Sequence, residues 1–143
     1  MSAASGGAAR LPPGGGPVVD VVPVALRPAA PGHWLVTWRL ANQGDQPLVV
    51  LAAWQPHGRF RAAQCAFDPP LRLAPGEQVT VELAVASSGE PGEVVENGFL
   101  ILRALWGDAP WRVLARLTLT YGADGAPAIA REAITTQPIG FSQ

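Results

Sequence analysis

The sequence predicts an all-β chain folded as two antiparallel sheets packed face to face. Three observations lead to this prediction: seven or eight short apolar runs, turn residues between them at regular spacing, and no sustained helical period. The chain has 143 residues, of which 48% are hydrophobic, so it is long enough for one domain with its own core. A barrel built from the same strands is the rival architecture.

The first half of the chain is expected to contain four strands. Residues 18–26 form the first, and Pro23 within it predicts an edge position or a bulge, because proline cannot donate to a ladder. Residues 33–42 form the second, with a clear period of two. Residues 48–54 are apolar on both faces, which is typical of a central strand, and residues 60–67 resemble a short edge strand. One face of the second strand carries Trp34, Val36, Trp38 and Leu40.

Turn residues delimit these strands. The segment 42–45 is a turn by composition, and the run Asp68-Pro69-Pro70 is expected to end the fourth strand. Residues 78–86 alternate strictly and form the fifth strand. The segment 87–97 is then the longest loop.

The second half is expected to end in a hairpin. Residues 99–106 and 111–121 are its strands, and the turn is Gly107-Asp108-Ala109-Pro110. Residues 128–134 could form a last strand or a short helix, and the strand is favoured. These seven or eight strands indicate a sandwich of immunoglobulin type.

The chain divides into three parts by composition. Residues 1–17 are rich in Gly and Pro and are predicted to be a disordered tail. Residues 18–122 form the β-sandwich domain, and residues 123–143 are a C-terminal extension with the last strand and a tail.

The middle of the chain carries a recurrent pattern. The runs LANQG at residues 40–44 and LVV at 48–50 are followed by LAPGE at 73–77 and VTVEL at 79–83. This pattern resembles bacterial immunoglobulin-like modules of the CARDB type over roughly residues 33–86. The resemblance implies a sandwich fold and a binding or adhesion-like role, without catalytic residues to carry over.

Charge and cysteine content exclude several classes of protein. The formal net charge of −1 argues against a nucleic-acid binder, which needs a basic footprint. Cys65 is the single cysteine, so no internal disulfide can form. Residues 1–10 hold no apolar leader, and the longest apolar run, 48–54, is too short for a membrane span. We therefore expect a soluble, cytoplasmic protein.

No motif predicts catalysis, a cofactor or a metal. Cys65 could pair with His57 or His33 as a nucleophile and base, but no signature surrounds them, and a half-buried packing role is expected for the thiol. The same three residues do not match a zinc spacing. The carboxylates of the long loop lack the alternation of a calcium loop, and the glycines at 14–16 lack the rest of a phosphate-binding loop. Those carboxylates belong to Glu90, Glu93 and Glu96.

The five tryptophans could stack on sugars, although Trp34 and Trp38 lie on the apolar face of their strand and are expected in the core. Trp106 and Trp111 bracket the hairpin turn and are expected to pair across it.

That pairing places an unusual set of side chains on the outer face of the hairpin. An outward face is ordinarily polar, whereas this one mixes aliphatic and aromatic residues with arginine, a composition found at protein interfaces. We expect it to bind a protein partner or a second copy of the chain, unless residues 128–141 fold back over it. The residues are Phe99, Ile101, Arg103, Leu105, Arg112, Leu114 and Arg116.

Three functions follow as hypotheses. The first is a non-catalytic immunoglobulin-like module that mediates protein–protein contact or assembly. The second is a carbohydrate or small-ligand module that uses exposed Trp. The third is an enzyme that uses Cys65 and a His.

Overall fold

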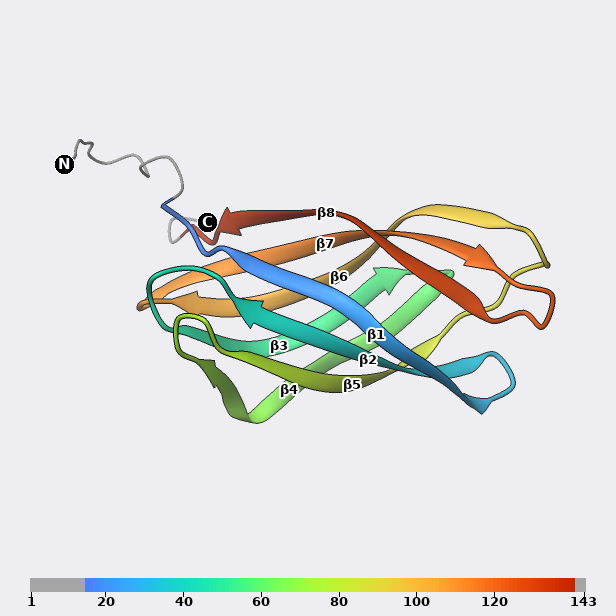
Figure 1. The fold of residues 1–143 in the computed structure, drawn as a ribbon, viewed down its shortest axis with the longest axis horizontal. Helices are drawn as coiled ribbons and strands as arrows, with labels where there is room; N and C mark the ends of the chain where they lie inside the picture. Colours follow the sequence, from blue (N-terminus) through green and yellow to red (C-terminus); the bar gives the residue numbers. More distant parts are fainter. Residues whose placement is uncertain (1–14, 141–143) are drawn as a thin grey trace.

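Residues 15–140, the part of the chain that the computed structural model describes, form eight antiparallel strands and no helix (Figure 1). The order across the single sheet is β1-β2-β5-β4-β3-β6-β7-β8. The prediction of an all-β, antiparallel fold is confirmed. The strands form one hydrogen-bonded sheet, whereas the sequence predicts two separate sheets. The strands are β1 (Val19–Ala30), β2 (His33–Asn42), β3 (Leu48–His57), β4 (Phe60–Leu73), β5 (Gln78–Ala86), β6 (Val94–Trp106), β7 (Ala109–Tyr121) and β8 (Pro127–Pro138).

The sheet curls until its first and last strands approach each other. Arg131 of β8 donates from Nε to the Val21 carbonyl at 3.2 Å and from Nη2 to Asp20 Oδ1 at 2.8 Å, both on β1. The junction between β4 and β5 is the weakest in the sheet, because Arg61 and Ala86 are its one paired position. In Figure 1, β1, β2 and β5 consequently lie in front of β3 and β6. The result is a nearly closed barrel with a weak junction on one side.

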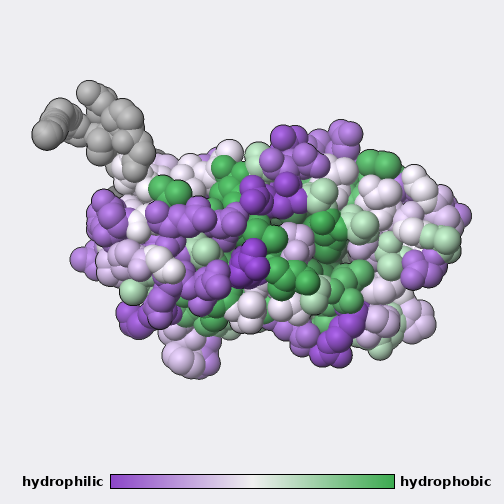
Figure 2. Space-filling model, in the orientation of Figure 1, coloured by the Kyte–Doolittle hydropathy of each residue, from purple (hydrophilic) through white to green (hydrophobic). Residues whose placement is uncertain are grey.

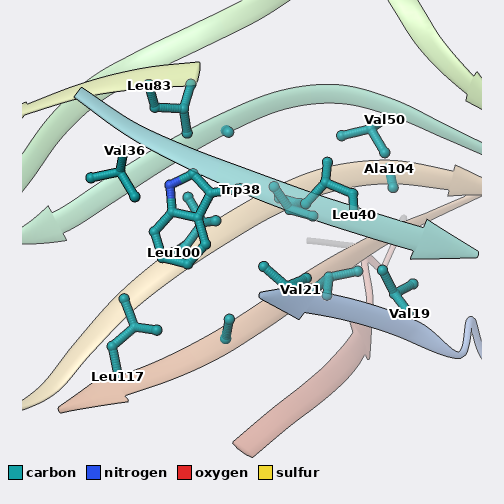
Figure 3. Close-up of a cluster of buried hydrophobic side chains, with 14 of the residues drawn as sticks. Val19, Val21, Val36, Trp38, Leu40, Val50, Leu83, Leu100, Ala104 and Leu117 are labelled. Atoms are coloured by element: carbon teal, nitrogen blue, oxygen red, sulfur yellow. The ribbon is translucent and has the colours of Figure 1, made fainter. Parts of the chain in front are cut away.

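The core lies between these two groups of strands. Side chains of period two point inward from both, and Trp38, Leu40, Leu100 and Leu117 have no exposed surface. Figure 3 shows Trp38 of β2 among aliphatic side chains from neighbouring strands, including Leu100 of β6. Burying each large aliphatic side chain stabilises the fold by about 1.5–3 kcal/mol, so this cluster holds the curled sheet together.

The register of the β6–β7 hairpin differs from the prediction. Trp106 pairs with Ala109, and Trp111 pairs with Ala104, so the two tryptophans are not opposite each other. The turn is the two-residue loop Gly107-Asp108, and Gly107 adopts a φ of 59°, which glycine accepts without strain. Because the register shifts by two residues, every side chain stays on its predicted face.

Strand β4 also differs from the prediction. The run Asp68-Pro69-Pro70 does not end the strand, which continues to Leu73. The ladder with β3 passes from Ala66 to Leu71 and leaves the prolines outside it, since a proline has no N–H to donate. β4 is not an edge strand, because it has β5 and β3 as neighbours.

The two ends of the chain were predicted more closely. β1 is an edge strand with a register shift after Pro23, as the proline indicated. Residues 127–138 form the strand β8, which pairs with β7. The predicted tail at residues 1–17 lies outside the described residues except for its last three positions. Among residues 15–140 no helix is long and apolar enough to cross a membrane.

Candidate interaction face

The outer face of β3, β6, β7 and β8 brings the predicted interaction residues together. Strands in a sheet place alternate side chains on one face, and directly paired residues lie side by side. Successive rows across this face are Val49–Leu105–Pro110, Ala52–Arg103–Arg112–Gln137, Trp54–Ile101–Leu114–Thr135 and Phe99–Arg116–Ala133. We call these residues the outer face.

Apolar and charged side chains on the outer face differ in exposure. Ile101 and Leu114 are half-buried, and so are Phe99 in the next row and Leu105 in the row beyond the Arg103–Arg112 pair. The three arginines are exposed. Ala52 is only 1% exposed although it points outward, so its larger neighbours cover it. The apolar residues are therefore less exposed than the longer arginine side chains beside them.

The C-terminal segment extends the outer face and does not fold back over it. β8 pairs edge to edge with β7 and contributes Ala133, Thr135 and Gln137 to the rows. In the range 15–140 no segment crosses the face. The expectation that residues 128–141 could cover it is wrong for their described part.

Arg103 and Arg112 are directly opposite each other on neighbouring strands. Like charges at paired positions repel, because their Cβ atoms are about 4.5–5.5 Å apart. Within the described chain the guanidinium group of neither arginine forms an ion pair or a hydrogen bond, and the same holds for Arg116 two rows along. No carboxylate stands at any position of the rows.

On the opposite side of the molecule two arginines have acidic partners, whereas Arg39 of β2 has none in the described chain. Arg27 of β1 pairs with Glu82 of β5 at 3.2 Å, and Arg131 pairs with Asp20 at the β1–β8 seam. Figure 2 views this side and shows hydrophobic surface interrupted by hydrophilic groups. The uncompensated arginine pair is thus a feature of the outer face.

The candidate nucleophile and bases lie apart. Cys65 is exposed on β4, opposite Ala53, so the expectation of a half-buried thiol is wrong. His57 lies four positions beyond Ala53 on β3, a distance of about 13 Å at the usual strand rise. Its Nδ1 accepts from the Arg59 N–H at 3.0 Å, while His33 is at the start of β2. In the described chain no group of acidic, His and Cys side chains could hold a metal ion.

The five tryptophans are all at least half-buried. Trp38, Trp106 and Trp111 are 0%, 7% and 4% exposed, as core packing predicts. Trp34 is partly buried, and its Nε1 donates to the Ser87 carbonyl at 3.0 Å. Trp54 is half-buried in a row of the outer face. A flat, open tryptophan on which a sugar could stack is not present among residues 15–140.

Two shallow apolar grooves lie where the sheet is open. One of about 390 Å³ follows the β1–β8 seam beside Leu26 and Ile129. The other, of about 320 Å³, lies between β4 and β5 beside Cys65 and Leu83. Both are lined mainly by Ala, Pro and aliphatic residues. They lack the convergent polar groups that orient a small ligand.

A polar network that the sequence did not reveal connects the β3–β4 turn, the segment after β5 and the end of β7 by hydrogen bonds. Arg59 of the β3–β4 turn donates to Glu93 at 2.8 and 3.0 Å and to the Ser88 carbonyl at 3.1 Å. Ser87 Oγ donates to the Arg59 carbonyl at 2.8 Å and lies 2.8 Å from Tyr121 Oη. The Tyr121 hydroxyl also donates to that carbonyl at 3.1 Å. These partners are 28 to 62 residues apart in sequence, so no local pattern could predict them.

Tyr121→Phe is expected to lower the free energy of unfolding by roughly 1–3 kcal/mol, because it removes a buried hydroxyl from a satisfied network. Urea denaturation measures the change. Thr120→Ala, one residue away and exposed, is the control and should change stability by less than about 0.5 kcal/mol. An equal effect of the two substitutions would contradict a stabilising role of the network.

Glu93 gives the fold a dependence on pH. The hydrogen bond from Arg59, helped by the Glu90 N–H, lowers the pKa of Glu93 below its ordinary value of 4.5. Its stabilising contribution is therefore fully present above about pH 4.5 and is lost as the pH falls through the folded-state pKa. Glu93→Gln should flatten the acid limb of a stability–pH profile. Glu90→Gln removes the same charge from the same loop but no hydrogen bond to Arg59, and should keep the slope of the unmodified chain.

Fold and face together define an all-β module whose most distinctive surface is an arginine-flanked apolar sheet face. Searches against protein-family models, curated proteins and solved structures found no match to the chain.

Proposed function

We propose that the chain is a non-catalytic, immunoglobulin-like module that mediates protein–protein contact or assembly through the outer face. The observation that carries the proposal is the Arg103–Arg112 pair, which stands without counter-ion between two apolar rows. Maintaining like charges side by side destabilises a sheet, so a binding role explains why the arrangement exists. Arginine beside aliphatic and aromatic residues is a composition enriched at protein interfaces.

The finer description of the fold is part of the proposal. The single Arg61–Ala86 pair between β4 and β5 supports two half-sheets, β1-β2-β5 and β4-β3-β6-β7-β8. Their inner faces enclose the core, as in an immunoglobulin-like sandwich. The larger half-sheet then presents the outer face to solvent as a broad, continuous platform.

Capture from the source cell on immobilised protein tests this function. The unmodified chain is compared with Ile101→Thr/Leu114→Thr, which removes the central apolar row and keeps residues that favour strands. Thr37→Ser/Thr80→Ser, on β2 and β5, is the control for the opposite side. We expect a discrete partner that the control retains and the apolar-row variant loses.

Light scattering after size-exclusion chromatography separates a second copy from a different partner. A dimer that the apolar-row variant lacks would support self-association. A monomer together with variant-sensitive capture would support a different protein. Capture and oligomeric state that are the same for all three proteins, with thermal melts confirming that each is folded, would overturn the proposed function.

A further inference from the structure

Five arginines lie at outward positions of the larger half-sheet, and none forms an ion pair in the described chain: Arg61, Arg72, Arg103, Arg112 and Arg116. Arg103 and Arg112 pair with each other, Arg116 lies on β7 four positions beyond Arg112, and Arg72 pairs with Val49 at the β4 side. The whole chain has a net charge of −1, so this basic cluster is local. A surface of this kind complements a partner of opposite charge.

The spacing on β7 specifies how acidic and apolar groups of the partner must alternate. Arg112, Leu114 and Arg116 occupy every second position and point to the same side. They are therefore about 7 Å apart along the strand, which is also the spacing of every second residue in an extended chain. A segment running along β7 could meet them with an acidic, an apolar and a second acidic side chain in turn.

Arg103 strengthens the first of these contacts. The two guanidinium groups of Arg103 and Arg112 start from paired positions, so both can approach one carboxylate. Arginine binds carboxylates through two parallel hydrogen bonds, and such charge-assisted bonds are about twice as strong as neutral ones. One carboxylate would also relieve the repulsion between the two arginines.

We propose that Arg103 and Arg112 form a carboxylate-binding centre, and that the partner of the outer face is an extended acidic protein segment with apolar residues between its acids. This inference rests on the proposed function and names the partner's chemistry. The apolar rows on both sides of the arginine pair favour a protein, because a phosphate backbone has no aliphatic side chain to place against Ile101 or Leu114. The net charge of −1 also opposes general attraction to polyanions.

Fluorescence anisotropy with a labelled synthetic peptide tests the proposal on the full chain. The peptide repeats glutamate, threonine, valine, threonine, and a version with glutamine in place of glutamate is its uncharged control. We expect binding that weakens with added salt, that is lost with the glutamine peptide, and that falls roughly tenfold or more in Arg103→Gln/Arg112→Gln. Arg27→Gln/Arg39→Gln removes the same charge from β1 and β2 and should bind as the unmodified chain does.

Three results would overturn the acidic-segment partner. The first is equal weakening by the two arginine variants, and the second is no binding of the glutamate peptide by the unmodified chain. The third is binding of a 20-base-pair DNA or of phosphatidylserine vesicles that is tighter than peptide binding and is lost in Arg103→Gln/Arg112→Gln. That result would assign the arginines to a nucleic acid or a membrane.

The capture experiment distinguishes failure of this inference from failure of the proposed function. Suppose Ile101→Thr/Leu114→Thr loses the partner while Arg103→Gln/Arg112→Gln retains it. The outer face is then an interface, but its partner is not recognised through acids. Retention in both variants would overturn the interface itself.

Discussion

Trp38→Ala is expected to lower the free energy of unfolding by about 3–5 kcal/mol, the largest effect of any single substitution considered for this chain. Trp38 has no exposed surface and lies within the aliphatic cluster drawn in Figure 3. Its removal leaves a cavity between the two groups of strands that curl around the core. Chemical denaturation monitored by circular dichroism measures the loss.

Two further substitutions show whether the effect comes from core packing. Trp38→Phe keeps most of the ring and removes the buried Nε1, which has no hydrogen-bond partner in the described structure, so its cost should be clearly smaller. Thr80→Ala, exposed on β5, should change stability by less than about 0.5 kcal/mol. A loss of under about 1 kcal/mol for Trp38→Ala would contradict the central place of this residue in the core.

Gln55→Met is expected to raise the free energy of unfolding by roughly 1–3 kcal/mol. Gln55 of β3 is fully buried, and neither its Oε1 nor its Nε2 has a hydrogen-bond partner in the described structure. An unpaired buried amide destabilises a fold, and methionine has a similar shape without the polar atoms. The same denaturation experiment measures the gain.

Gln78→Met, at the exposed start of β5, is the matched control and should be nearly neutral. A stability loss of about 1 kcal/mol or more for Gln55→Met would mean that the amide is hydrogen-bonded in solution. The inward surface of β3 would then be partly polar.

The sequence was sufficient to predict the strands whose side chains alternate. Residues 33–42 and 78–86 became β2 and β5 with the predicted bounds, because one face of each is buried against the same core. The hairpin face was also predicted correctly despite a wrong register. A shift of two residues preserves the period of two, so Ile101 and Leu114 still point outward with the three arginines.

Other features depend on contacts that no local pattern contains. The turn composition at 107–110 favoured four turn residues, whereas Gly107 at positive φ allows a tighter loop. The two prolines at 69–70 predict the end of β4, although a strand can continue past prolines where its neighbour makes no ladder bond with them. Arg59 and Tyr121 meet only because the curled sheet brings one end of β7 to the β3–β4 turn.

Site-specific photocrosslinking in the source cell tests the central claim, that the outer face is a contact surface, most directly. A benzoylphenylalanine is placed at position 114 on β7 in one protein and at position 37 on β2 in another. We predict a discrete crosslinked species from position 114 and none from position 37. No crosslink from position 114 in a folded protein, or the same species from both positions, would contradict the claim.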